Sequence, residues 1–360
     1  MNYILDKTDR PVYLQLYRLL RADLLAGAFP YGSRLPSKRL LAEETGVSTV
    51  TVEHAYDLLC EEGYAEARER SGYFASFRAD DGFAVSAAPQ RPMQPTRAEP
   101  ATGGFPLTLL SRTMRRVLSD YGERILERPP NAGCMELREA LRQYLARNRG
   151  ISAEPDQIYI GSGAEYLCGL LVDLLGRDKT YAIESPSYEK IELVYRTAGV
   201  AYERLPLSAD GIDSAALAAT HADVLHTTPY RSFPTGVTAS ASKRYEYIRW
   251  SDGGGRFLIE SDYDSEFSVS AKPAETLFAL ADHDNVIYLN TFSKTISPSL
   301  RVGYLVLPRR LIDVFAARLG GYSCTVPTFE QFVLTELLNS GDFERHINRV
   351  RRQKRRELAL

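Results

Sequence analysis

A single lysine lies on a short polar loop that could carry covalent chemistry. Lys294 stands in the run YLNTFSKTISPSLRVGY over residues 288–304. Its amine can form a Schiff base with an aldehyde cofactor. Thr291 and Ser293 offer hydroxyl groups, and Arg301 offers a planar guanidinium that suits a phosphate group. Most lysines only solvate a surface, so the hypothesis depends on the whole set and its spacing.

A second candidate segment is glycine-rich. The run Gly161-Ser162-Gly163-Ala164-Glu165 follows an apolar β-like stretch and precedes a helical pattern. Backbone N–H groups at the start of a helix can bind a phosphate group. A Gly-Ser-Gly run alone is more often only a turn. The phosphate-binding interpretation therefore depends on the presence of Lys294 in the same chain.

The elements that must position these residues alternate along the chain from about residue 105. Helical patterns separate short apolar runs, which is typical of a mostly parallel α/β sheet. The predicted strands are Gln157–Ile160, Lys179–Ile183, Val224–Thr227, Arg256–Ile259, Asn285–Leu289 and Gly303–Val306.

The N-terminal part has a different pattern. Residues 13–26 place Leu, Tyr and Ala at helical spacing and predict a first helix. Pro36 and Ser37 open a second helix, Gly46 makes a turn, and Ser48 caps a third helix. A helix, a short glycine-containing turn and another helix are the helix-turn-helix pattern. Two glycine-aromatic runs, Gly63-Tyr64 and Gly72-Tyr73-Phe74, bracket a short hairpin that would form a wing.

DNA binding would use the hydroxyl groups at the start of the third helix, because that end enters the major groove. Ser48, Thr49 and Thr51 lie there, and three cations upstream could meet phosphates. Ser48 alone is more often a helix cap, and His54 is more often a surface residue. We expect DNA contacts from Arg34, Ser37, Lys38, Arg39, Ser48, Thr49, Thr51 and Gly72.

Composition sets limits on these interpretations. The net charge is −2, and residues 1–78 hold 10 Lys/Arg against 11 Asp/Glu, so the DNA hypothesis depends on where the cations lie. Residues 79–104 are rich in Ala, Pro, Gly and Thr, which predicts a flexible linker between domains 1–78 and 105–360. The four cysteines lack metal-ligand spacing, and no segment is typical of a signal peptide or a membrane span. We therefore expect a cytoplasmic protein without a metal.

The first module resembles the winged helix of GntR-type regulators. The motifs that carry the resemblance are LPSKRLLA over 35–42, GVSTVTV over 46–52 and AYDL over 55–58. They cover most of residues 11–78, and their combination is specific. The resemblance implies sequence-specific binding of a double-stranded DNA operator.

The second module resembles fold-type I aminotransferases, which bind pyridoxal 5′-phosphate. Its motifs are the S-K-x-x-x-P-x-x-R run from Ser293, ESPSY over 184–188, TPYRSFPTG over 228–236 and ESDYDSEF over 260–267. The resemblance implies a Schiff base on Lys294 and a pyridine ring stacked on Tyr188, whose other interpretation is core packing. The implied cofactor contacts are Gly163, Ala164, Tyr188, Ser261, Asp262, Tyr263, Thr291, Ser293, Lys294 and Arg301.

The whole chain is similar to the MocR/GabR/PdxR-like subfamily of GntR regulators, which implies a head-to-tail homodimer. One departure concerns the pyridine nitrogen. The family pattern E-D-D-Y-D places a carboxylate there, but aligning on Tyr263 places Ser261 at that position, unless Asp262 substitutes. A serine favours a neutral pyridine and poor transamination. Lys190 is a candidate partner for an anionic ligand, although a solvated helix lysine is the commoner case.

A further expectation concerns the end of the chain. Residues 342–360 predict an amphipathic helix with a cationic face. No Gly or Pro stop signal follows it, and we expect the C-terminal small domain of the family to be missing. The family's carboxylate-binding arginine lies in that domain.

Three functions follow from these patterns. The leading hypothesis is a transcription regulator, not an enzyme, that senses pyridoxal phosphate, an amine or an amino acid through Lys294. The alternative is an active aminotransferase with an accessory domain, which needs an electron sink and a substrate-binding arginine. The third is a regulator whose second domain is only a dimerisation scaffold, and Lys294, Arg301 and Tyr188 together argue against it.

Overall fold

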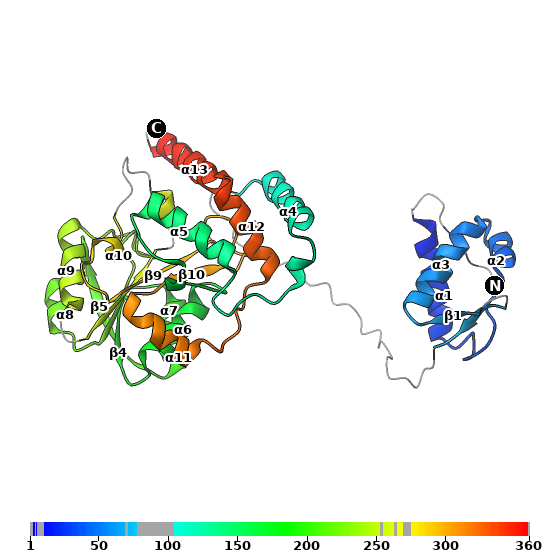
Figure 1. Cartoon of the computed structure of the whole chain (residues 1–360), viewed down its shortest axis with the longest axis horizontal. Coiled ribbons are helices and arrows are strands. Elements are labelled where there is room, and N and C mark those ends of the chain that lie inside the picture. Colours follow the sequence, from blue (N-terminus) through cyan, green and yellow to red (C-terminus); the bar gives the residue numbers. More distant parts are fainter. Residues whose placement is uncertain are drawn as a thin grey trace. The chain divides into compact units, whose positions relative to one another are not determined.

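The structure is a computed structural model that describes residues 3, 5, 11–68, 71–77, 104–252, 255–262, 265–268 and 275–358. The chain divides into two compact units, Met1–Thr96 and Arg97–Leu360, and we describe each by itself (Figure 1). The predicted linker, apart from residue 104, lies outside the described residues, so its boundaries remain a prediction.

The first unit has three helices and a hairpin in its described part. They are α1 Val12–Leu25, α2 Lys38–Thr45, α3 Thr49–Glu61, β1 Ala65–Arg68 and β2 Gly72–Ala75. Leu16, Leu20, Val52 and Leu59 are fully buried between the helices. Burial of a leucine or valine side chain contributes about 1.5–3 kcal/mol, and it sets the packing of α1 against α3.

Local signals set the ends of α2 and α3. Ser37 Oγ accepts the N–H of Leu40 at 3.2 Å, and Ser48 Oγ accepts that of Thr51 at 3.1 Å. Gly46 has a φ of +64° and ends α2 in the left-handed conformation that favours glycine. The hydroxyl of Tyr56 donates to the carbonyl of Pro36 at 2.7 Å and so ties α3 to the start of α2. The predicted helix-turn-helix and wing are therefore both present.

The second unit is built on an eight-stranded sheet with the order β3-β10-β9-β8-β7-β4-β5-β6. Its central strands β9, β8, β7, β4 and β5 are parallel, whereas β10 runs antiparallel to both of its neighbours. The strands are β3 Ile158–Gly161, β4 Thr180–Ser185, β5 Ala201–Ser208, β6 Gly211–Ile212, β7 Val224–Thr227, β8 Phe257–Ser261, β9 Val286–Thr291 and β10 Gly303–Val306.

Helices cover both faces of this sheet (Figure 1). On one face α6 Ala164–Leu175, α7 Glu189–Ala198 and α11 Ile312–Leu319 bury Ile287 and Leu289 of β9. Val286 and Tyr288 of the same strand face the opposite side, because successive strand side chains alternate. The opposite side is covered by α4 Leu107–Tyr121, α5 Met135–Arg149, α8 Ser214–Ala219, α9 Ala241–Ser251, α10 Leu277–Leu280, α12 Thr328–Asn339 and α13 Asp342–Leu358.

Short 3₁₀ turns complete the described elements at Gly122–Leu126, Pro155–Gln157, Ser265–Phe267 and Arg309–Leu311. The six predicted strand runs each coincide with a strand, whereas β5 and β6 were missed. The predicted cationic helix over 342–360 is α13. No helix in the described part of the chain is long and apolar enough to cross a bilayer.

A buried ion pair lies beneath the sheet on the α5 side. Arg149 ends α5 and pairs with Asp262, and their side chains are 2% and 0% exposed. The hydroxyl of Tyr288 donates to Asp262 Oδ2 at 2.7 Å. Two buried opposite charges require each other, because either one alone would remain desolvated and uncompensated.

Removal of this arginine therefore tests the packing between α5 and the sheet. We expect Arg149→Leu to lower the free energy of unfolding of the second unit by roughly 3–5 kcal/mol. The only tryptophan, Trp250, lies in α9, so its fluorescence during denaturant unfolding reports on this unit.

The matched control is Arg147→Leu on the same helix. Arg147 is 52% exposed and pairs with Glu344 at 3.1 Å, and such exposed pairs contribute about 0–1 kcal/mol. Equal losses in the two variants would contradict a special role for the buried pair.

Candidate functional site

A cavity of about 480 Å³ opens where the parallel strands of the second unit end. Ligands of open α/β sheets bind at these carboxyl ends. The lining residues come from β4, β7, β8 and β9, from the starts of α6 and α7, and from the lysine loop: Ala164, Glu165, Ile183, Glu184, Ser187, Tyr188, Lys190, Ile191, His226, Thr228, Phe233, Ser261, Leu289, Thr291, Ser293, Lys294, Pro298 and Arg301.

The lysine loop and the start of α6 meet in this cavity. Lys294 follows the end of β9 by three residues and lines the wall together with Thr291, Ser293 and Arg301. Gly163 caps α6 with a φ of +88°. A Cβ atom there would lie 3.4 Å from Arg301 Nη2. The positive φ favours glycine at this position, and the Arg301 guanidinium lies beside the start of the helix. A guanidinium next to helix N–H groups can bind an anion.

Lys190 and Arg301 both lie near one carboxylate. Lys190 Nζ lies 3.0 Å from Glu165 Oε1, and Arg301 Nη2 lies 3.8 Å from the same oxygen. Lys190 lines the cavity, but its ammonium is paired with Glu165, and 53% of its side chain is exposed to solvent.

An aromatic wall stands on the open side of the cavity. Tyr188 is 42% exposed and meets Phe233 edge to face, with ring centroids 6.0 Å apart. A tyrosine used for core packing would be buried, so this ring presents a face to whatever enters the cavity.

Strand alternation separates the two residues that were candidates for the pyridine nitrogen. Ser261 lines the cavity and pairs in register with Leu289, which faces α6. Asp262, one residue later, points to the opposite side of the sheet and is engaged by Arg149. The structure therefore does not bring Asp262 into the cavity. Tyr263 lies outside the described residues.

A chain of three buried side chains leads into the cavity, and two of its members were missed from the sequence. His226 Nε2 lies 2.7 Å from Ser261 Oγ, and His226 Nδ1 lies 2.7 Å from the hydroxyl of Tyr195. Burial lowers the pKa of His226 to about 4, so the ring is neutral at pH 7. Strand alternation along β7 could have predicted that His226 faces the same side of the sheet as Val224. Its contact with Ser261 could not be predicted, because it requires β7 and β8 to be neighbours.

Glu184 also lines the cavity, and no role was predicted for it from the sequence. This buried carboxylate accepts hydrogen bonds from the hydroxyls of Thr227 and Ser232 and, at 2.9 Å, from the N–H of Thr228. Burial raises its pKa, and the three donors oppose that effect. Glu184 thus fixes the loop after β7 against the end of β4, and its oxygens are occupied by protein donors.

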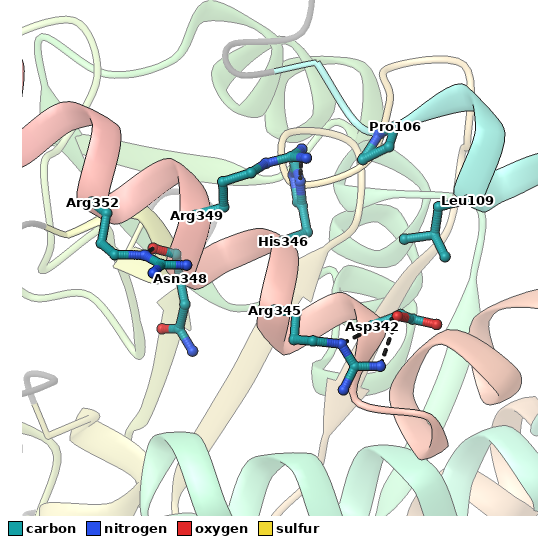
Figure 2. Close-up of a pocket in the computed structure, with 8 residues that line it drawn as sticks. All are labelled: Pro106, Leu109, Asp342, Arg345, His346, Asn348, Arg349 and Arg352. Atoms are coloured by element: carbon teal, nitrogen blue, oxygen red, sulfur yellow. Dashed lines mark hydrogen bonds and ion pairs between the residues drawn. The ribbon is translucent and has the colours of Figure 1, made fainter.

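A second cavity of about 490 Å³ lies between the start of α4 and α13 (Figure 2). Within it His346 links several parts of the unit. Its Nε2 donates to the carbonyl of Thr295 at 3.1 Å, and its Nδ1 accepts from Arg349 at 3.0 Å. The ring of Phe105 lies 4.8 Å from that of His346. Thr295 directly follows Lys294, so this contact supports the lysine loop from the other side of the sheet.

In the first unit the predicted DNA contacts gather at the helix-turn-helix and the hairpin. Arg34 forms an isolated bridge with Phe74, and a Cβ atom at Gly72 would lie 3.4 Å from Arg34 Nε. The structure thus brings the cation before α2 next to the wing. Arg39 and Thr49 are exposed at the starts of α2 and α3.

Three of the predicted contacts also have structural roles. Ser37 and Ser48 cap their helices, and Ser48 Oγ lies 2.8 Å from the hydroxyl of Thr51. Lys38 pairs with Glu53 at 2.5 Å and joins α2 to α3. Val50 was missed, although it is 56% exposed on the first turn of α3. An exposed apolar side chain at this position suits a thymine methyl group.

Two family comparisons cover most of the chain. Residues 12–74 match the bacterial regulatory proteins of the gntR family. Residues 106–359 match aminotransferase class I and II. The predicted winged helix joined to a fold-type I domain is therefore confirmed.

Relatives that share both modules are named as transcription regulators. The chain is 31% identical to the uncharacterized HTH-type transcriptional regulator YdeL of Bacillus subtilis over 98% of this chain and 78% of the relative. It is 28% identical to the probable rhizopine catabolism regulatory protein MocR of Rhizobium meliloti, over 97% and 76%. It is 29% identical to the pyridoxine biosynthesis regulator PdxR of Corynebacterium glutamicum, over 96% and 77%.

Solved aminotransferases share the fold of the second unit. A kynurenine aminotransferase of Pyrococcus horikoshii superposes with a TM-score of 0.64 at 25% identity. LysN, an α-aminoadipate aminotransferase of Thermus thermophilus, superposes with a TM-score of 0.63 at 27% identity. Each match covers 70% of this chain and 65% of the solved chain.

The buried histidine of the cavity makes the stability of the second unit depend on pH. Unfolded His226 takes up a proton near pH 6.5, but the folded ring does so only near pH 4. Its contribution is therefore complete above pH 6.5 and is lost as the pH falls toward 4. We expect the wild type to lose roughly 3 kcal/mol more than His226→Gln across this range.

Denaturant unfolding followed by Trp250 fluorescence measures this difference. Carboxylates such as Glu184 titrate in both proteins, so their contributions cancel in the comparison. Parallel stability curves for the two proteins would show that the ring is not held neutral.

Proposed function

Since the chain belongs to the MocR/PdxR-like subfamily of GntR-family transcription regulators, we propose that it regulates transcription in response to pyridoxal phosphate or to an amine that reacts with it. DNA binding falls to the winged helix, and sensing falls to the cavity of the second unit. The proposed partners are a double-stranded operator and a second copy of the chain in a head-to-tail homodimer. Because a DNA-binding regulator must reach its operator, we propose that the protein acts in the cytoplasm.

The observation that carries the sensing proposal is the joint position of Lys294, Arg301 and the α6 start around one cavity. An aldehyde needs the amine, and a phosphate group needs the guanidinium and the helix N–H groups. A scaffold that had lost its ligand would need none of these. The Arg301 guanidinium beside the glycine that begins α6 supports the fit of a phosphate group.

The cofactor would supply an aldehyde that exchanges one amine for another. Around it, Lys294 would provide the resident amine, and Arg301 with Gly163 and Ala164 would hold the phosphate. Tyr188 would cover one face of the ring and exclude water from it. Thr291 and Ser293 would contribute hydroxyl groups beside the phosphate, and Ser261 would stand at the inner end of the cavity. Tyr263 remains a predicted cofactor contact.

An active aminotransferase is the competing function. It would require a carboxylate at the inner end of the cavity, where the described part of the chain presents Ser261. The names of the relatives also favour regulation. Amine turnover by the full chain that disappears in Lys294→Ala would favour the enzyme instead.

A visible absorption spectrum tests the cofactor and its lysine. We expect purified protein with added pyridoxal phosphate to develop the band of a lysine-linked cofactor, and Lys294→Ala to lose it. The matched control is Lys190→Ala, which removes another lysine of the same cavity wall. A band in all three proteins, or in none, would contradict the role of Lys294.

Salt-dependent DNA binding tests the winged helix. Arg39 is exposed at the start of α2, so we expect Arg39→Ala to weaken binding to all sequences and to reduce the slope of log K against log salt by about one. A fragment located by footprinting upstream of the gene provides the DNA. Arg18→Ala is the control, because Arg18 is exposed on α1, outside the helix-turn-helix. The assignment fails if both variants keep the wild-type slope.

A further inference from the structure

Tyr195, His226 and Ser261 form a chain of two hydrogen bonds, and the donor and acceptor in each can be assigned. Tyr195 is fully buried, and in the described part of the chain His226 Nδ1 is the one acceptor within reach of its hydroxyl. A buried hydroxyl that did not donate would leave its hydrogen without a partner. Tyr195 therefore donates to Nδ1.

The tautomer of His226 follows from that bond. A neutral imidazole carries one hydrogen, so an accepting Nδ1 places the hydrogen on Nε2. Nε2 then donates to Ser261 Oγ across 2.7 Å. Burial, which lowers the pKa of the ring to about 4, keeps it from gaining a second proton.

Ser261 is left with one hydroxyl hydrogen to give. Its Oγ contacts only His226 among the described residues, and the side chain lines the cavity. The relay therefore presents a hydrogen-bond donor to the cavity. Its hydrogen can meet the lone pair of an unprotonated pyridine nitrogen. The second lone pair of Oγ could accept from a protonated nitrogen, but a neutral hydroxyl lacks the negative charge that stabilises a pyridinium ion.

No described carboxylate of the cavity takes the place of Ser261. Glu184 accepts from three protein donors. Glu165 pairs with Lys190 and lies near Arg301. Asp262 lies across the sheet with Arg149. Within the described lining, the inner end of the cavity is therefore uncharged.

We propose that Ser261, oriented by His226 and Tyr195, donates a hydrogen bond to the pyridine nitrogen of the bound cofactor and keeps that nitrogen unprotonated. This inference rests on the proposed binding of pyridoxal phosphate. An unprotonated ring is a poor electron sink. An effector amine that displaced Lys294 from the cofactor aldehyde would release the free lysine and would not itself be converted further, so it would persist as a signal. Ser261 would contact the cofactor directly, and His226 and Tyr195 would be positioning residues that act through it.

The test is ¹⁵N NMR of the full chain loaded with pyridoxal phosphate labelled at the ring nitrogen. At pH 7 the wild type should give the chemical shift of an unprotonated pyridine. Ser261→Asp should move the signal to the range of a protonated pyridine, because the new carboxylate stabilises the N–H. Ser187→Asp is the matched control: it adds the same charge to the same cavity wall without touching the relay, and should leave the signal unprotonated.

The outcomes separate this inference from the proposed function. A protonated signal in the wild type overturns the inference and leaves cofactor binding intact. Failure of the label to bind the wild type overturns both. A protonated signal in both Asp variants would attribute the change to added charge and would contradict the relay. Since the wild-type spectrum decides the main point, the test does not depend on the folding of a variant.

Discussion

The alternation of side chains at the end of β8 is the constraint on which the rest of the second unit depends. Ser261 and Asp262 are adjacent in the chain, yet they face opposite sides of the sheet. The charged residue therefore stabilises the α5 side by pairing with Arg149. The neutral residue ends a hydrogen-bonded relay in the cavity. A shift of one residue would exchange these two environments.

This division explains how an aminotransferase fold can serve regulation. The cavity holds Lys294, Arg301 and the start of α6, the groups that we propose to bind an aldehyde phosphate. It presents a neutral donor where turnover would need a negative charge. Binding and conversion depend on different ends of the same cavity, so one can be lost while the other stays. The buried Arg149–Asp262 pair shows that a carboxylate is tolerated at this strand end, but on the side away from the cavity.

Much of this architecture could be predicted from the sequence, because its signals are local. Apolar runs marked six strands, and the motif around Lys294 marked the cavity. β5 was missed because AYERLPLS carries charges and a proline on a strand with a single buried residue. The antiparallel direction of β10 and the contact of His226 with Ser261 depend on strand order. The order of strands is set by packing between distant segments, which no local pattern records.

The lysine loop is also held by a residue far away in the sequence, which no local pattern could predict. His346 of α13 donates to the carbonyl of Thr295, which follows Lys294, and its ring lies against Phe105. Figure 2 shows His346 beside Arg349 within an arginine-rich cavity. Hydrogen bonding to Arg349 and to a carbonyl requires Nε2 to carry the hydrogen and Nδ1 to accept, as in His226. One side chain thus joins the loop that would bind the ligand to the segment just before α4. Any shift of Thr295 must either break this bond or move the ring on which Phe105 packs.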